Sequence, residues 1–329
     1  MGQINECVNT ALLTEDKQSG GKAPKKNGFT ERKRKKALFL ISFLAFPVIQ
    51  FCIFYIGVNI NTVVLSFQEY DIDAGKYTFA GFTNYATVIR DIFVNGTLTI
   101  AIRNSTIQFF VNLIIALPLH VFVAYCVWKK LPFSEVFKVI LFLPSMVSGT
   151  VFVMIVRYLL DYGVPALFDV PTPLNAMTFD GFKTILIYDL WIGFAGGMVV
   201  YLGAMSNISE DVVEYGKLEN LNTFQEFIYL VVPSIFPTIT TYLVASIAGF
   251  FTNYGSAYTF FGGSASSNAF HTLGYHFFVK VAGIGSGSDL SSQANYPYAA
   301  AGGFLFTVVV APITLLVKWL LEKYGPSDE

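Results

Sequence analysis

The side chains that most often carry out chemistry in proteins are few in this sequence, and they form no catalytic group. The histidines are His120, His271 and His276, and the last two are five residues apart, which is not the HExxH spacing of a zinc site. The Gly-Gly-Ser turn at 262–264 lacks the Gly-Lys-Ser/Thr ending of a phosphate-binding loop. The sequence therefore predicts no catalytic residue, no metal site and no ATP hydrolysis by this chain alone.

Several polar side chains interrupt long apolar stretches, where such groups often mark functional sites. Gln108 and Asn112 are four residues apart in one stretch. Arg157 and Asp161 have the same spacing in another, which predicts an ion pair between them. Asp189 opens a further stretch, and we expect it near the outer interface. These groups do not form the line of buried carboxylates that proton-coupled transporters use.

One acidic segment, Glu210–Pro237, lies between two long apolar segments. Its first half has apolar residues three apart at Leu218, Leu221 and Phe224, which predicts a short amphipathic helix. Its second half has no charge from Phe227 onward, as in a membrane-spanning segment. Such a helix presents itself to a partner outside the membrane. The alternative is an ordinary cytosolic loop capped by acidic residues.

The composition is that of an integral membrane protein. The chain is 54% hydrophobic and 13% charged, whereas soluble domains have about 25% charged residues. Residues 1–36 are polar and basic, and we expect a tail whose charges orient the first helix. An arm that binds nucleic acid or lipid is the alternative. The three cysteines are too few for a disulfide framework.

Apolar stretches of about 20 residues predict six transmembrane helices and an all-α fold. Their expected bounds are Ala37–Val58, Asn104–Trp128, Val136–Leu160, Thr184–Met205, Phe227–Phe251 and Ala299–Leu321. An even number of spans puts both termini on one side. Most Lys and Arg residues fall on that side, so both termini and the acidic helix should face the cytoplasm. The other side carries Lys76, Arg90, Arg103, Lys183 and Lys280, and Arg157 is unassigned.

The segments expected on the outer side contain some structure of their own. Residues 66–103 should form a loop with a short helix after Gly81. Residues 161–183 are rich in proline and should form a loop. Residues 252–298 are rich in Gly and Ser, and we expect a short helix on the membrane surface at Phe270–Val281.

The acidic segment resembles the EAA loop of membrane subunits of binding-protein-dependent ABC importers. In that family's loop, Glu-Ala-Ala is followed by a Gly and then by a Leu-Pro pair with a further Pro. The corresponding residues here are Glu214-Tyr215-Gly216, Glu219-Asn220-Leu221, Phe224-Gln225-Glu226-Phe227 and Val232-Pro233 with Pro237. Asn220 replaces the Gly, and asparagine tolerates a left-handed backbone better than most residues. Tyr215 is bulky where the family has Ala.

The resemblance extends over most of the chain and is to the carbohydrate-importer branch, which includes the maltose-type and multiple-sugar permeases. The motifs that carry it are Ala80-Gly81-Phe82-Thr83-Asn84-Tyr85, Arg103-Asn104-Ser105, Leu141-Phe142-Leu143-Pro144, Phe261-Gly262-Gly263 and Tyr296-Pro297-Tyr298-Ala299-Ala300-Ala301. Their order agrees with the topology predicted from charge.

The resemblance implies a type I ABC importer permease fold in a prokaryotic-type cell membrane. It implies a basic tail (1–36), a first helix with an outer loop (37–103) and a five-helix core (104–329), with the coupling helix at about 210–226 and an outer loop at 252–298. The implied partners are a second permease subunit, expected to be a different chain, two nucleotide-binding ATPase subunits and an extracytoplasmic solute-binding protein. ATP and Mg²⁺ would bind to the ATPase subunits, and this chain would bind no cofactor and no nucleic acid.

The resemblance also implies site residues. Coupling to the ATPase would use Glu214, Tyr215, Gly216, Glu219, Asn220 and Leu221. Segments that line the path in the family carry Asn112, Tyr188, Trp191, Tyr242, Phe251, Asn253 and Tyr254, which are aromatic and amide side chains of the kind that bind sugars. In a chain this rich in Phe and Tyr, lipid-facing aromatic residues are the alternative explanation.

Two other function classes stay open from the residues alone. A stand-alone secondary transporter or channel would function from this chain alone and would lead us to expect acidic residues near the midplane. A membrane-embedded enzyme would need the catalytic cluster that the sequence lacks. The sequence does not specify which carbohydrate is carried.

Overall fold

The computed structural model describes residues 26–94, 96–132, 134–169, 171, 179–254, 256–261, 268–282 and 289–326, and it divides into two units at Asn61 and Thr62. The first unit contains α2 (Lys26–Gln50) and the π-helical turn η1 (Phe51–Gly57), and α3 (Val58–Ser66) begins in it. This apolar helix buries none of its most hydrophobic window, as expected of a helix whose surroundings are lipid. It already begins at Lys26, inside the segment predicted to be a basic tail.

The second unit begins with a small module that precedes the helical bundle. The strands β1 (Gln68–Asp71) and β2 (Lys76–Phe79) form an antiparallel hairpin in which Gln68 pairs with Phe79. Asp71 Oδ1 accepts hydrogen bonds from the backbone N–H groups of the turn, and Gly75 has a φ of +61°, so the turn is stabilised locally. α4 (Thr83–Phe93) follows, which confirms the helix predicted after Gly81. The hairpin shows that the prediction of an all-α chain was wrong in this detail.

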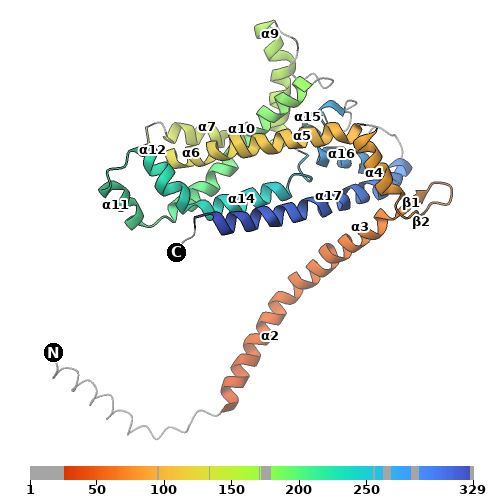
Figure 1. The fold of residues 1–329 in the computed structure, drawn as a ribbon, viewed down its shortest axis with the longest axis horizontal. Coiled ribbons are helices and arrows are strands. Elements are labelled where there is room, and N and C mark those ends of the chain that lie inside the picture. The colour runs from red at the N-terminus through yellow and green to blue at the C-terminus, as the bar shows by residue number, and fades with distance from the viewer. Residues whose placement is uncertain are drawn as a thin grey trace. The chain divides into compact units, whose positions relative to one another are not determined.

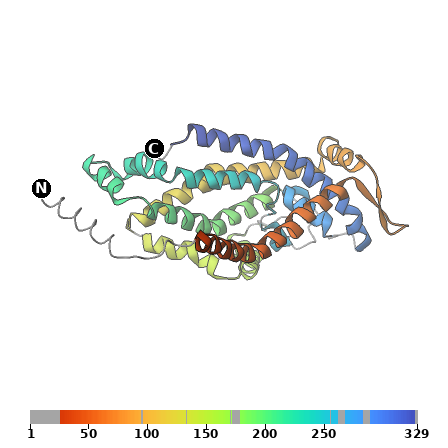
Figure 2. The same cartoon turned by 90° about the horizontal axis from the view of Figure 1, so that it is seen from below.

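The bundle consists of α5 (Thr97–Val111), η2 (Asn112–Ala116) and α6 (Leu117–Trp128), together with α10 (Phe179–Ser206), α14 (Phe236–Ala248) and α17 (Asp289–Tyr324). α14 and α17 lie side by side in both views (Figures 1 and 2). Three clusters of buried side chains hold the bundle together. They centre on Tyr125 and Tyr201, on Tyr188 and Phe260, and on Leu98 and Tyr298.

Proline explains three of the π-helical turns. η2 is followed by Pro118, η3 (Leu159–Gly163) by Pro165, and η4 (Phe227–Val231) by Pro233. A proline cannot donate a hydrogen bond to the carbonyl four residues earlier, which in each case belongs to the π-helical turn. The helices therefore widen instead of breaking.

Five helices among the described residues are long and apolar enough to cross a membrane, or six if a bent pair counts as one span. The bent pair is Thr223–Ser234 and Phe236–Ala248, and the two halves meet at 68° between Pro233 and Pro237. The predicted fifth span therefore exists as a broken helix.

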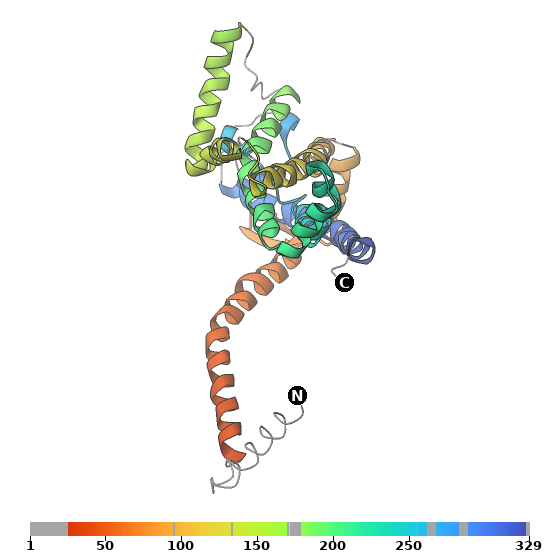
Figure 3. The ribbon, with the colours of Figure 1, turned by 90° about the vertical axis from the view of Figure 1, so that its left-hand side faces the viewer.

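The predicted third span, Val136–Leu160, was wrong as a single helix. α7 (Ser134–Met146) ends, Ser148 has an extended ψ of 126°, and α8 (Gly149–Tyr158) starts a new helix. The helix then continues through η3 and α9 (Val164–Phe168), so residues 161–168 are not the predicted loop. This α8–α9 helix projects away from the bundle (Figures 1 and 3).

The two ends of the bundle carry different elements. One end holds α11 (Glu210–Leu218) and α12 (Thr223–Glu226), near the C-terminal end of α17. The other end holds the hairpin, α4 and α16 (Leu273–Val281). Between α14 and α16, the chain forms α15 (Ala257–Phe261) and the short turn η5 (Asn268–Phe270). Figure 1 shows both ends. The helix predicted at Phe270–Val281 is thus present, but it buries Leu273, Tyr275 and His276 instead of lying on a surface. The predicted Gly-rich turns flanking it lie outside the described residues.

Candidate functional site

The acidic segment forms two short helices instead of one. α11 ends at Leu218 and α12 begins at Thr223, so the predicted helix through Leu218, Leu221 and Phe224 was wrong. The reason is Asn220, whose φ of +53° places it in the left-handed region that ends helices. The backbone N–H of Leu221 donates to Gly216 O at 3.2 Å, which closes the helix end in the manner of a Schellman motif.

α11 turns one face inward and one outward. Gly216 is buried, and a Cβ at this position would come within 3.1 Å of Leu230. Glu214 is exposed, and Tyr215 and Leu218 expose 58% and 85% of their surface. Because exposed apolar side chains of this size mark interaction surfaces, we call the outward residues Glu214, Tyr215, Leu218, Glu219 and Phe224 the loop face.

The loop face is joined to the bundle by α12. A capping box stabilises the start of α12: Gln225 N donates to Asn222 Oδ1 at 2.9 Å, and Asn222 N donates to Gln225 Oε1 at 3.1 Å. At its end, the buried Glu226 carboxylate pairs with Lys129 Nζ at the C-terminus of α6. Tyr125 Oη, also on α6, donates to Thr223 O at 3.0 Å. A displacement of α11 and α12 would therefore act on α6 through these bonds.

A polar cavity of about 240 Å³ lies between α5 and the end of α14. α5 and the first residue of η2 contribute Ser105, Gln108, Phe109 and Asn112 to its lining. α14 and the residues after it contribute Ser246, Gly249, Phe250, Thr252 and Asn253. Asn112 is exposed near the middle of the span Leu98–Trp128, at the point where η2 begins. An exposed amide at that depth is costly in lipid and favourable in a water-filled or ligand-filled path.

The backbone around the cavity is positioned by α16. Thr272 Oγ1 donates to Asn253 O at 3.0 Å, and Leu273 N donates to Ser105 Oγ at 2.9 Å. Gly274 packs so closely that a Cβ would lie 2.9 Å from Asn253 O. Asn104 Nδ2 donates to Ala269 O and His271 O. The two walls of the cavity are therefore linked to one helix.

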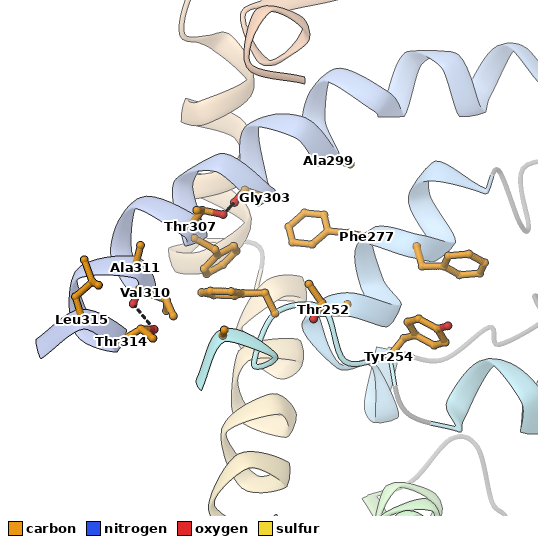
Figure 4. Close-up of a pocket in the computed structure, with 15 residues that line it drawn as sticks. Thr252, Tyr254, Phe277, Ala299, Gly303, Thr307, Val310, Ala311, Thr314 and Leu315 are labelled. Carbon is orange, nitrogen blue, oxygen red and sulfur yellow. Dashed lines mark hydrogen bonds between the residues drawn. The ribbon is translucent and has the colours of Figure 1, made fainter. Parts of the chain in front are cut away.

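A larger cavity of about 690 Å³ has the wrong chemistry for a sugar (Figure 4). It lies between α14, α16 and α17, and its lining is mostly apolar, including Phe251, Phe277 and Phe306. Of its three lining threonines, Thr252, Thr307 and Thr314, the last two donate within their own helix, to Gly303 O and Val310 O. A groove of this kind suits acyl chains or another apolar surface.

The structure separates the predicted path residues. Asn112 and Asn253 line the polar cavity, and Phe251 and Tyr254 line the apolar one. Tyr188 is buried against Phe260, and Trp191 packs on Phe152. Tyr242 contacts Tyr201 with ring centroids 5.4 Å apart. These residues do not form one site.

One pattern in the sequence indicated the polar cavity: Gln108 and Asn112 are four residues apart, and both line it. Gln108 is buried, and its Nε2 donates to Asp189 Oδ2 at 3.2 Å. Asp189 Oδ1 accepts from Ser256 N at 3.2 Å and from Ser256 Oγ at 2.5 Å. α10 begins at Phe179, before the predicted start of the fourth span at Thr184, and Asp189 lies in its first half. The structure confirms the ion pair between Arg157 and Asp161, at 3.5 Å.

His271 and His276 are buried, with ring centroids 5.8 Å apart. Their ring nitrogens have no hydrogen-bond partner among the described residues. Burial lowers the pKa of each histidine to about 4. Within the part of the chain that the structure describes, no group of three or more His, Cys, Asp or Glu side chains could hold a metal ion.

Known proteins similar to this chain are transport permeases. The Bacillus subtilis (strain 168) arabinooligosaccharides transport system permease protein AraP is 24% identical over 304 residues, covering 89% of this chain and 92% of that protein. The multiple sugar-binding transport system permease protein MsmF of Streptococcus mutans serotype c is 20% identical, with 86% and 95% covered.

A solved structure shares the fold. A chain of a bacterial ABC transporter involved in the import of the acidic polysaccharide alginate superposes with a TM-score of 0.68 at 17% identity, covering 91% of this chain and 99% of that one. The family model described as "binding-protein-dependent transport system inner membrane component" matches residues 101–326, which is more than half of the chain. The chain therefore belongs to the family of binding-protein-dependent transport system inner membrane components.

Proposed function

We propose that this chain is the membrane permease subunit of an ATP-driven importer that moves a carbohydrate into the cytoplasm. The observation that carries the coupling role is the loop face on α11 and α12, which is acidic and apolar, exposed, and joined to α6 through Glu226 and Lys129. The family match and the similarity to sugar permeases support the transport of carbohydrate.

α11 would dock on a separate ATPase subunit. Its carboxylates would pair with basic residues of that subunit, and Tyr215 and Leu218 would supply apolar contact area. Glu210 and Asp211 in the first turn and Lys217 in the last turn suit the helix dipole, so the helix is ordered before it docks. When the ATPases close on ATP and Mg²⁺, the pair of permease subunits would change its opening from one side of the membrane to the other.

The orientation that we infer places α11 in the cytoplasm. Lys129, Lys130 and Lys323 lie at the same end of the bundle as α11, whereas Lys76 and Lys280 lie at the other end. This distribution follows the positive-inside rule. A solute-binding protein would then deliver the carbohydrate to the end that holds the hairpin, α4 and α16. A solved alginate ABC transporter in complex with its periplasmic protein is 16% identical to this chain.

A second permease subunit would complete the path. Arg157 and Asp161 lie near the middle of the span Gly149–Phe168, and Arg157 is half exposed. Charges at that depth face protein or water more favourably than lipid. Asn112 is exposed at a similar depth, so we expect the partner permease to cover these groups and to enclose the polar cavity.

The carbohydrate would bind in the polar cavity. Amide groups from Gln108, Asn112 and Asn253 donate to and accept from hydroxyls, and Phe109 and Phe250 offer aromatic faces. This combination of amides and rings is typical of protein sites for sugars. Uptake should fall about tenfold for Asn112→Ala or Asn253→Ala, because each change removes hydrogen bonds to the substrate.

The coupling role is tested by purifying the chain with its ATPase subunits in detergent. Glu214→Ala and Leu218→Asp should reduce the amount of ATPase that co-purifies, and should uncouple ATP hydrolysis from uptake in reconstituted vesicles. Glu322→Ala is the matched control. It removes an exposed carboxylate of α17, which pairs with Lys318 on the surface. Transport by the chain reconstituted alone would overturn the proposal and favour the secondary-transporter alternative.

A further inference from the structure

The polar cavity is lined by uncharged groups and has a carboxylate directly behind it. Its described lining residues carry amides, hydroxyls and aromatic rings, and none is charged. Gln108 lines the cavity and donates through Nε2 to Asp189 on α10. The side chain of Gln108 is therefore the layer between the cavity and the carboxylate.

Burial disfavours the charged form of Asp189, and three hydrogen-bond donors oppose that effect. Its two oxygens accept three hydrogen bonds, from Gln108 Nε2, Ser256 N and Ser256 Oγ, and acceptance of donors stabilises a carboxylate. No ion pair of Asp189 occurs among the described residues; Arg157 pairs with Asp161 and donates to Phe260 O. Within the described part of the chain, the partners of the Asp189 carboxylate are therefore hydrogen-bond donors and not a cation.

The bond from Gln108 Nε2 also orients the amide. One N–H of Nε2 donates to Asp189, which leaves Oε1 as an acceptor and the second N–H as a donor for a ligand, close to the negative charge of Asp189. Sugar hydroxyls can donate to Oε1. The carboxylate of a uronic acid cannot donate to Oε1 when ionised, and it would meet the like charge of Asp189 behind Gln108.

We propose that Asp189, acting through Gln108, makes this cavity select uncharged carbohydrates and reject acidic ones. The proposal rests on the proposed function, because it assigns the substrate class of the same cavity. It sets this chain apart from the alginate transporter, whose fold it shares and whose described substrate is an acidic polysaccharide.

The test measures binding to the assembled transporter without its solute-binding protein, so that only the permease selects. The probes are neutral arabino-, galacto- and malto-oligosaccharides and, for comparison, oligosaccharides of galacturonic acid of equal length. Wild type should bind the best neutral probe at least about tenfold more tightly than the acidic ones, since like charges brought together are strongly disfavoured.

Three variants separate charge from structure. Asp189→Asn removes the charge and keeps an oxygen for Ser256, and it should reduce the preference for neutral probes to about threefold or less. Asp189→Glu keeps the charge and should retain the preference. Asp161→Asn removes a carboxylate from another span and should leave the preference unchanged. A purely structural role of Asp189 would weaken the binding of both classes together and would leave their ratio unchanged.

The outcomes distinguish this inference from the function on which it rests. Equal binding of neutral and acidic probes by wild type, or an unchanged ratio in Asp189→Asn, would overturn the charge selection alone. If no probe binds to wild type, or if Asn112→Ala and Asn253→Ala leave binding unaffected, the assignment of the cavity itself is wrong.

Discussion

At the scale of single residues, the most consequential contacts are those that bury a charge or a titratable ring. Glu226 is buried at the base of the loop face and has Lys129 as its ion-pair partner. His271 and His276 are buried next to α5, and none of their ring nitrogens has a partner among the described residues. Such groups stabilise the fold only in one ionisation state or with one partner, so they are sensitive points of the molecule.

Replacing Lys129 by Ala should lower the free energy of unfolding by about 3 kcal/mol, because the change leaves the buried Glu226 carboxylate unpaired. Thermal unfolding in detergent measures this effect. Lys138→Ala, which breaks an exposed pair with Glu135 at 4.0 Å, is the control and should cost less than about 1 kcal/mol. Equal shifts for both variants would mean that the pair between Lys129 and Glu226 is no stronger than a surface contact.

The buried histidines should make the stability dependent on pH. Their pKa values are about 4 in the folded protein and about 6.5 when exposed, so the unfolded chain binds more protons between these values. Stability should therefore be fully present above pH 6.5 and should fall as the pH drops from 6.5 to 4. Burial dominates the lowered pKa of His276; His271 and Lys280 lower it further, and Asp91 raises it.

Unfolding temperatures measured from pH 7.5 to pH 5 test this expectation. His276→Phe keeps a ring of similar size and should flatten the decline over that range. A decline that is equally steep in His276→Phe and in His271→Phe would assign the pH dependence to other groups.

At the scale of elements, the most extensive contact between two described helices joins α6 and α10. A Cβ at Gly197 would lie 2.2 Å from His120 Nδ1, whereas a Cβ at Gly193 or Gly196 would have no neighbouring atom within 4 Å. The imidazole of His120 thus occupies the space that glycine leaves on α10. Small residues at helix contacts of this kind are common in membrane proteins.

Gly197→Ala should destabilise the chain by about 1–3 kcal/mol, since His120 must move out of its place. Gly193→Ala and Gly196→Ala should be neutral or slightly stabilising, because alanine is the better helix former. Unfolding temperatures in detergent measure all three. Adding His120→Ala to Gly197→Ala should recover part of the loss; a lack of recovery would contradict the proposed contact.

Two breaks in the helices also belong to this scale. Asn220 ends α11 with a left-handed backbone, and the bend between Pro233 and Pro237 divides the following span. The loop face, the bend and α14 therefore follow one another along the chain, and α14 ends at the polar cavity. In the proposed function, motion at α11 would reach the cavity wall by this route as well as through Lys129 at the end of α6.

At the scale of the whole molecule, the orientation of the chain in the membrane is the central prediction. We expect α11 in the cytoplasm and the β1–β2 hairpin outside. In a background without Cys7, Cys52 and Cys126, Lys217→Cys should react with an impermeant maleimide only in broken cells or inverted vesicles. Lys76→Cys should react in intact cells. The reverse pattern would invert the topology and would contradict the proposed docking of α11 on an ATPase.

The sequence by itself determined the class of the protein, most of its spans and the place of the acidic segment. Length and hydropathy define a membrane helix almost independently of its neighbours, because lipid demands that each span satisfy its own backbone. The charge pattern predicted that Glu210–Glu226 lies outside the membrane, and the spacing of Arg157 and Asp161 predicted their ion pair. The coupling residues themselves stay a prediction.

Only the tertiary structure decided which side chains meet. Asp189 contacts Gln108, which is 81 residues away, and Ser256, which is 67 residues away, and no local pattern encodes such pairs. The same holds for Lys129 with Glu226 and for Gly197 with His120. Packing between helices also decides where the predicted path residues lie. Their residue types suit sugars, but Tyr188 is buried in the core, whereas Asn112 and Asn253 line one cavity. The helices break at Ser148 and at Asn220, and the hydropathy of the sequence does not reveal such backbone breaks. For this reason the third span and the helix through Leu218, Leu221 and Phe224 were predicted wrongly as single helices.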